Sequence, residues 1–538
     1  MTEQAVELIA LLLAAVLALA AVARRLVVPY PILLVLGGLV LGFVPGLPPV
    51  RINPDIVFFV FLPPVLWAAA FFTSFRDFKA NLRPIALLAF GLVLATTAVV
   101  AVVARAVVPG LGWAGAVALG AIVSPPDAVA ATTVLRRLKI PHRVLVILEG
   151  ESLVNDATAL VLYRTAVAAM VTGVFHPGEA VGGFVLAAVG GVAIGLVVGW
   201  IAVLALDRLH DSLTEIAVTL LAPYIAWSVA ERAHTSAVLA CVAGGLLLRR
   251  HFSRVIAPAT RLQGRAVWDL LLFALNGVIF ILIGLSLRAL AGSVPPGELP
   301  SLIVQGLIVS AAAIGTRLIW VPIATVVPRL LPSVRARDPM PPWSSVLLVG
   351  WTGLRGIVSL AAALALPFTT AGGAPLPLRA ELILLTFTVI VVTLVVQGLS
   401  LAPIIRRLRL PEDTRLEEEE AHARERAAVA ALERLTSMPG VAEHHAVADL
   451  RDDYEERKRT IAEFHAGVPR SSSLAEAAFK RARHETLAAE RRALIELRDR
   501  GDISDEVLLV LEEELDREAL RHGLANVRTD ARGERPHE

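Results

Sequence analysis

Cysteine is almost absent from this chain of 538 residues. The single cysteine, Cys241, excludes an intramolecular disulfide and argues against a metal site built from thiolates. The net charge is only +2, which gives no indication of a nucleic-acid partner. The apolar runs contain no HExxH motif, and the histidines lie mainly in loops and in the tail, which argues against a membrane-embedded enzyme. A repeated filter segment is also missing, which argues against an ion channel.

Hydrophobic residues are abundant and unevenly distributed. They make up 56% of the chain, whereas soluble domains have about 45–50%. Long apolar runs with short polar breaks continue to about residue 410, and the chain then becomes strongly charged. We therefore predict an all-α polytopic membrane domain over residues 1–410 and a helical cytoplasmic region over residues 411–538.

The apolar runs are candidate membrane spans. Thirteen of them can be drawn, at 5–28, 30–44, 55–72, 84–108, 112–134, 143–172, 180–206, 214–232, 235–250, 268–291, 301–327, 344–367 and 380–408. A straight span needs about 20 residues, so the second and ninth are short. The first run lacks a basic start and is long enough to span, which predicts a retained membrane helix rather than a cleaved signal.

Basic residues are concentrated in the loops on one side of the predicted membrane domain. The loop before the sixth run, for example, carries Arg136, Arg137, Lys139 and Arg143, whereas the opposite loops carry few basic residues. Such loops face the cytoplasm. The pattern predicts a multi-pass protein of the cell membrane with its N-terminus outside and its C-terminus in the cytoplasm.

Two of the apolar runs are interrupted. The fifth contains "SPPDAVAA", Ser124 to Ala131, and the twelfth contains "GLRGIVS", Gly353 to Ser359. Adjacent prolines remove backbone donors, and glycines weaken a helix. The breaks lie seven runs apart, which predicts two inverted repeats with an ion site at the paired breaks. The alternative is two independent packing kinks.

The sixth run carries acidic residues deep in its apolar sequence, "ILEGESLVNDATALVLYR". At 1.5 Å per residue, Asp156 lies about 18 Å into the membrane. At 100° per residue, Glu151, Ser152, Asn155 and Asp156 share one flank of the helix. An ionised carboxylate at that depth costs at least about 2.5–3.5 kcal/mol, so it persists where it faces water, an ion or a partner. Competition between protons and cations for Asp156 is the chemistry of cation/proton exchange; the alternative is a neutral, hydrogen-bonded Asp.

Three further charges lie in the interrupted or apolar runs. Asp127 can balance helix N-termini and assist an ion, and Arg355 in the other break can balance helix C-terminal ends as a structural counter-charge. Arg317 in the eleventh run is placed to pair with Glu151, which would neutralise two costly buried charges. The alternative for Glu151 is a role as an ion ligand.

These segments resemble the cation:proton antiporter-1 family, which includes sodium/proton exchangers. The resemblance covers about residues 5–408 and rests most specifically on "GESLVNDATALVLY", Gly150 to Tyr163. Weaker matches are "SPPDAVA", "GLRGIVSLAAALALP", "FLPPVLWAAAF" and "GVIFILIGLSL". The resemblance implies crossed broken helices, a core domain and a dimerisation domain, an elevator-like motion and a homodimer.

The resemblance also implies roles for single residues. Asp156 would bind the proton or the monovalent cation, and Asn155 would mark the electroneutral branch. Ser152, Asp127 and the backbone at Pro126 would line the site, so Asp156, Asp127 and Ser152 are the expected cation ligands. It implies sodium/proton exchange without a cofactor, the transported species being Na⁺ or K⁺ and H⁺. Potassium/proton exchange is the alternative.

Two departures from the family pattern affect the expected site. Trp67-Ala68 stands where some members carry a Glu, so one acidic group is missing. Pro126 and Ala128 flank Asp127 where Thr and Asp-Pro are expected, so a hydroxyl ligand is lost. The charged tail is predicted to be helical, as a solvated tail or as a regulatory or dimer-stabilising module, with residues 524–538 disordered.

Overall fold

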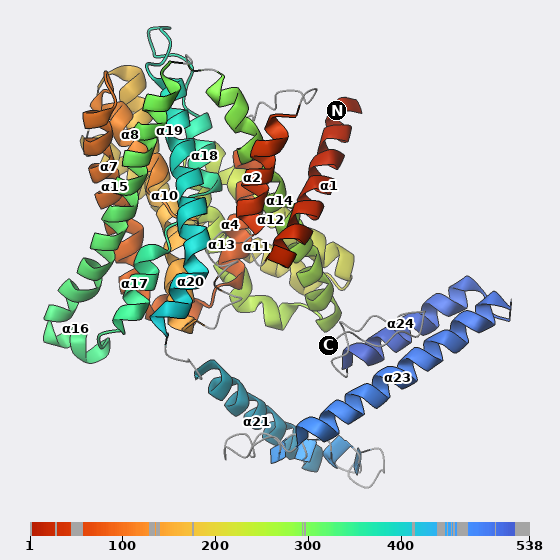
Figure 1. Ribbon diagram of the computed structural model, residues 1–538. Helices are drawn as coiled ribbons and strands as arrows, with labels where there is room; N and C mark the ends of the chain where they lie inside the picture. The colour runs from red at the N-terminus through yellow and green to blue at the C-terminus, as the bar shows by residue number, and fades with distance from the viewer. Residues whose placement is uncertain are drawn as a thin grey trace. The chain divides into compact units, whose positions relative to one another are not determined.

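The protein folds as a set of α-helices that divide into two compact units, Met1–Asp413 and Thr414–Glu538. The computed structural model (Figure 1) describes residues 3–26, 30–44, 57–127, 135, 140–174, 177–292, 294, 297–410, 415–437, 447–448, 450–452, 454–455, 458–459, 472–500 and 502–521. Within these residues, the only β pairing is an isolated bridge between Thr369 and Pro375. The prediction of an all-α protein is confirmed.

The first half of the large unit contains the helices that lead up to the acidic run. They are α1 (Glu3–Leu26), α2 (Tyr30–Gly42), the π-helical turn η1 (Val57–Phe61), α4 (Leu62–Phe72), α5 (Phe75–Ala80), α6 (Leu82–Ala86), the π-helical turn η2 (Leu87–Leu92), α7 (Val93–Val107), α8 (Trp113–Val123) and α10 (His142–Thr172). Helix α10 ends at Gly173, whose positive φ of 76° lets the chain turn in the left-handed region.

The second half begins with five long helices and ends with shorter, interrupted ones. It contains α11 (Pro177–Arg208), α12 (Ser212–Arg232), α13 (Ala237–Val255), α14 (Pro258–Ala291), α15 (Leu299–Val326), η3 (Val327–Leu330), α16 (Pro332–Arg337), α17 (Trp343–Trp351), α18 (Ile357–Leu364), α19 (Arg379–Val392), η4 (Thr393–Gln397) and α20 (Gly398–Leu408). Asp211 begins α12 by accepting a hydrogen bond from the Thr214 amide at 2.9 Å.

The predicted apolar runs are mainly helical where the structure describes them, apart from the breaks at 124–127 and 352–356. Among the described residues, six helical stretches are long and apolar enough to cross a membrane: 82–107, 182–208, 212–232, 258–286, 299–330 and 379–408. Shorter apolar helices lie at 10–23, 30–42, 58–72 and 113–123. Several predicted spans are therefore broken or only partly described, and the total of thirteen stays a prediction.

Helix pairs in the large unit follow the pattern expected of a repeat. Helix α2 packs on α14, and α4 packs on α13. If the repeats are equivalent as the paired breaks predict, α2 corresponds to α13 and α4 to α14, so the two contacts are counterparts. Helices α7 and α15, which would also correspond, pack on each other. This pattern supports the predicted inverted repeat.

Several apolar clusters hold the large unit together, and two of them include residues of the interrupted helices. One joins α7, α8, α15 and α19 and includes Val100, Leu119 and Val309, all fully buried. The other joins α4, α11, α12 and α13 and includes Leu206 and Cys241. Cys241 is a packed apolar side chain here, as its place in an apolar run indicates.

The small unit contains α21 (Arg415–Thr436), α23 (Ser472–Asp499) and α24 (Asp505–Arg521). Helices α23 and α24 pack through Leu487 and Leu515. Arg483 pairs with Glu518, and Arg491 pairs with Asp516, across the same contact. The predicted disorder of residues 524–538 lies outside the described residues.

Candidate functional site

The two predicted helix breaks meet each other. Helix α8 ends at Val123, and residues 124–127 are not helical. Helix α17 ends at Trp351, and the chain runs without helical bonds to Gly356 before α18 begins. The Asp127 amide donates to the Leu354 carbonyl at 2.6 Å, which joins the breaks directly. Residues 128–131 of the first predicted break, including Ala128, lie outside the described residues.

The side chain of Arg355 lies at the helix ends that the breaks create. Its Nε donates to the Val123 carbonyl at the end of α8 at 2.9 Å, and its guanidinium also bonds to the Gly353 carbonyl. The side chain is only 1% exposed. The last carbonyls of a helix have no partner within it and carry partial negative charge. The structure thus places Arg355 where a counter-charge to helix C-termini is needed.

Glu151 and Arg317 are brought together by α10 and α15. The two terminal nitrogens of Arg317 donate to the two carboxylate oxygens of Glu151 at 2.5 and 2.8 Å, and both side chains are 1% exposed. The Nε of Arg317 donates to the Val349 carbonyl near the end of α17, at 3.1 Å. Because both Glu151 oxygens are engaged, this geometry favours the structural pair over a Glu151 ion ligand.

A cavity of about 180 Å³ opens beside the crossed breaks. Helices α4 and α14 form one wall, and the α8 break, α10 and the start of α18 form the other. A water molecule occupies about 30 Å³ of liquid volume, so the cavity accommodates a partly hydrated small ion. Its polar lining residues are Asp127, Glu149, Ser152, Asp156, Asn276 and Ser359.

The lining of this cavity is acidic. Asp127, Glu149 and Asp156 all contribute to it, and none of the described lining residues is basic. Asp156 is 5% exposed and has no hydrogen bond or ion pair within the described part of the chain. Carboxylates that share a cavity repel each other, and a cation relieves that repulsion. The arrangement therefore selects for a positively charged occupant.

Asp127 and Asn155 are positioned by the breaks themselves. The Asp127 carboxylate lies against Gly356, at the N-terminal end of α18, where the helix dipole favours negative charge. Asn155 is fully buried, and its amide nitrogen donates to the Pro126 carbonyl at 3.3 Å. Asn155 is not among the residues that line the cavity. Asn155 therefore ties α10 to the break. Pro126, which was predicted to line the site, does line the cavity, and its carbonyl accepts this bond from Asn155.

Three polar residues of the cavity, Glu149, Asn276 and Ser359, are not among the predicted site residues. The side-chain oxygens of Asn276 and Ser359 are buried without a hydrogen-bond partner among the described residues. Asn276 interrupts an apolar run in "LLFALNGVIF", which is the signal that could have revealed it. Ala68 lies on the same wall, buried at 2%, where some relatives were expected to have an acidic group. Asn276 supplies a neutral oxygen to that wall.

Crossed helix breaks beside a carboxylate-lined cavity define a class of membrane protein that binds a cation at unwound helices. The chain belongs to the sodium/hydrogen exchanger family, because the model of the transmembrane sodium/hydrogen exchanger matches residues 11–407.

Similar proteins cover nearly the whole chain. A Mycobacterium tuberculosis protein named as an uncharacterized Na⁺/H⁺ exchanger is 37% identical over 95% of both chains. The sodium, potassium, lithium and rubidium/H⁺ antiporter of Bacillus subtilis is 30% identical over 94% of this chain and 76% of its own. The sodium proton antiporter of Methanocaldococcus jannaschii has the same fold, with a TM-score of 0.59 over 75% of this chain and 98% of its own, at 18% identity.

Proposed function

We propose that this protein exchanges sodium ions for protons across the membrane, with Asp156 binding either one cation or one proton. The observation that carries this proposal is the cavity that three carboxylates line, with no basic group among its described lining residues, around a space large enough for an ion. Protonation of Asp156 removes its charge, and loss of that proton creates the site for the cation. Asp127 and Ser152 are the neighbouring oxygen ligands, as proposed from the family pattern.

Transport requires that the occupied cavity open to each side in turn. The cavity lies between α4 and α14 on one wall and α8, α10 and α18 on the other. We assign the second group, together with α7, α15, α17 and α19, to a moving core and the first group to a fixed dimerisation domain. Sliding between the two walls would expose Asp156 to one side of the membrane and then to the other. The protein would act as a homodimer, with its C-terminal region in the cytoplasm.

Potassium is the second candidate cation. Relatives in two Bacillus species are named as antiporters of sodium, potassium, lithium and rubidium.

The test is to reconstitute the purified protein into proteoliposomes that contain a pH dye and to apply the chloride salt of each cation. Sodium should drive the largest proton movement; equal responses to potassium would support the broader alternative, and no response to any cation would contradict antiport.

Gly356→Ala is expected to weaken cation binding without unfolding the protein. A Cβ atom at Gly356 would overlap the Asp127 carboxylate, which lies on a short side chain whose backbone is held by Leu354. Displacing one charged ligand costs about 1.5 kcal/mol or more, which is roughly tenfold in affinity. The cation concentration for half-maximal exchange measures the effect.

The matched control is Gly315→Ala on α15, where an added Cβ meets nothing within 4 Å. This variant should exchange like the native protein. If both variants bind the cation normally, the Asp127 carboxylate is not held against the α18 terminus as described.

Exchange should be insensitive to membrane voltage. If Asp156 carries one proton in one direction and one monovalent cation in the other, no net charge crosses in a cycle. Asp127 lies at the N-terminal end of α18, where the helix dipole favours its charged form. A potassium/valinomycin potential across proteoliposomes should therefore not shift the equilibrium pH reached at a fixed sodium gradient. A shift would show that a second carboxylate, Asp127 or Glu149, also carries a proton.

A further inference from the structure

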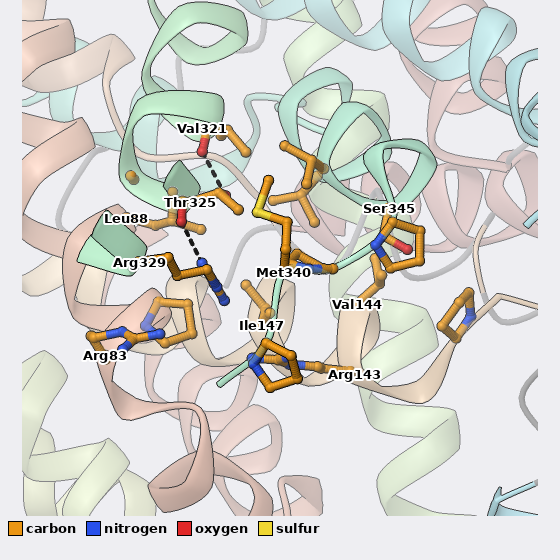
Figure 2. A pocket seen from close by; sticks show the side chains of 18 residues that line it. Arg83, Leu88, Arg143, Val144, Ile147, Val321, Thr325, Arg329, Met340 and Ser345 are labelled. Carbon is orange, nitrogen blue, oxygen red and sulfur yellow. Dashed lines mark hydrogen bonds between the residues drawn. The ribbon is translucent and has the colours of Figure 1, made fainter. Parts of the chain in front are cut away.

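A second cavity lies away from the carboxylate site, at the basic end of the large unit. It measures about 320 Å³, within the size range of ligand pockets. Its walls come from α6, η2, the start of α10, the end of α15 and the segment 339–349. It shares no lining residue with the carboxylate cavity. Figure 2 shows Arg83, Arg143 and Arg329 around it, with Met340 projecting toward its centre.

The three arginines are held around one carboxylate. Asp338 accepts hydrogen bonds from Arg143 at 2.8 Å and Arg329 at 2.6 Å, and it also pairs with Arg83. Burial would raise the pKa of Asp338, but hydrogen bonds and charges from Arg143 and Arg329 outweigh burial and lower it. Asp338 is therefore ionised, and three guanidinium charges face a single negative charge. The cluster keeps a positive surplus.

Two of these arginines retain access to an incoming anion. The side chains of Arg83 and Arg143 are 34% and 40% exposed, whereas Arg329 is 8% exposed. Arg329 is also committed to the backbone, because it donates to the Thr325 and Asp338 carbonyls. The Nε of Arg143 donates to the Asn81 side-chain oxygen at 3.0 Å, so Arg143 offers its terminal N–H groups. Arg83 and Arg143 are thus the groups that can bind a phosphate, which arginine recognises through its N–H donors.

The rest of the cavity is apolar. Leu88, Val144, Ile147, Val321 and Val346 line it beside the arginines. A free inorganic anion would use the arginines and leave this surface unfilled. A molecule with an anionic end and a hydrocarbon body would use both parts, because each methylene that it buries contributes about 0.8 kcal/mol.

The segment beside the cavity has the composition of a membrane interface. Leu330, Leu331, Met340 and Trp343 are exposed at 73%, 60%, 41% and 54%. Helix α16 adds Arg335 and Arg337 to the same short segment between α15 and α17 (Figure 1). Exposed apolar and tryptophan side chains mixed with arginines are typical of segments at the boundary of acyl chains and headgroups.

We propose that this cavity binds an anionic phospholipid. Its phosphate would bind to Arg83 and Arg143, and the part of the acyl chain nearest the headgroup would pack against Leu88, Val144 and Ile147. Basic pockets between membrane helices on the cytoplasmic side are suited to such headgroups. The bound lipid contacts the ends of α6, α10 and α17 together. It therefore stabilises the folded large unit independently of the ion that the protein carries.

The test uses the purified full-length protein in mild detergent with added lipid. Phosphatidylglycerol should raise the midpoint of thermal unfolding in a saturable manner, and phosphatidylcholine should not. The double variant Arg83→Gln/Arg143→Gln should need roughly thirtyfold more phosphatidylglycerol for the same shift. The control Arg208→Gln/Arg250→Gln removes two exposed arginines elsewhere and should respond like the native protein. Equal loss in both double variants would overturn the proposal.

Two further arms separate the lipid from its headgroup and from a folding defect. Glycerol 1-phosphate has the anionic group without acyl chains, and it should stabilise the native protein far less than phosphatidylglycerol. Equal stabilisation would show that the cavity takes an anion rather than a lipid. Ser345→Phe fills the apolar part while leaving the arginines intact, and it should reduce retention of phosphatidylglycerol in native mass spectrometry. Undiminished retention by this variant would place the lipid elsewhere.

Discussion

Asp156→Asn is expected to abolish cation-driven proton movement while the protein remains folded. Asparagine has nearly the same shape, but it cannot exchange a proton for a cation near neutral pH. Because Asp156 has no hydrogen bond or ion pair within the described chain, the substitution breaks no contact that supports the fold. The unfolding midpoint should therefore stay the same or rise, since an ionised carboxylate in a buried site is costly.

The measurement is the sodium-driven pH change in proteoliposomes, at several pH values and with the unfolding midpoint recorded in parallel. Asp207→Asn, at the exposed end of α11, makes the same chemical change away from the cavity and should retain full exchange. Asp156→Glu keeps a titrating group and should keep some exchange with altered affinity. Substantial exchange by Asp156→Asn would remove Asp156 from the mechanism and leave Asp127 and Glu149 as the remaining carboxylates of the cavity.

Features that follow from one helix at a time could be predicted from the sequence. The breaks near Pro125 and Gly353 follow from residues that cannot continue a helix, and the structure ends α8 and α17 close to them. The place of Asp156 near the middle of α10 also follows, because the apolar run that it interrupts forms one helix. A pairing of Glu151 with Arg317 followed from the cost of leaving either charge alone in an apolar run, and the structure brings these two side chains together.

Apart from the Glu151–Arg317 pair, contacts that depend on how helices cross could not be predicted. Asn276 and Ser359 reach the cavity because α14 and α18 approach α10, and no spacing within either helix encodes that approach. The acceptor of Arg355, the Val123 carbonyl, belongs to the other break, 232 residues away in sequence. Asp338 gathers arginines from three separate elements for the same reason. Charge in a loop indicates a side of the membrane, but not a partner.

Removing either member of the Glu151–Arg317 pair is expected to destabilise the protein severely. Each side chain is 1% exposed, and the partner left behind would be a buried unpaired charge, which costs about 3–5 kcal/mol. Glu151→Gln leaves Arg317 without its carboxylate, next to the buried guanidinium of Arg355. Arg317→Ala also frees the Val349 carbonyl near the end of α17. The arginine variant should therefore be the less stable of the two.

The double variant Glu151→Gln/Arg317→Ala should lose much less stability than the sum of the single losses, because it leaves neither charge unpaired. Unfolding midpoints of all four proteins in the same detergent give the coupling. The exposed pair Arg164–Glu231, with a nitrogen–oxygen distance of 2.8 Å and side chains 50% and 40% exposed, is the control. Its cycle should give a coupling of about 0.2–1 kcal/mol. Additive losses at Glu151 and Arg317 would mean that the carboxylate and the guanidinium do not neutralise each other, and Glu151 would then have to be considered again as an ion ligand.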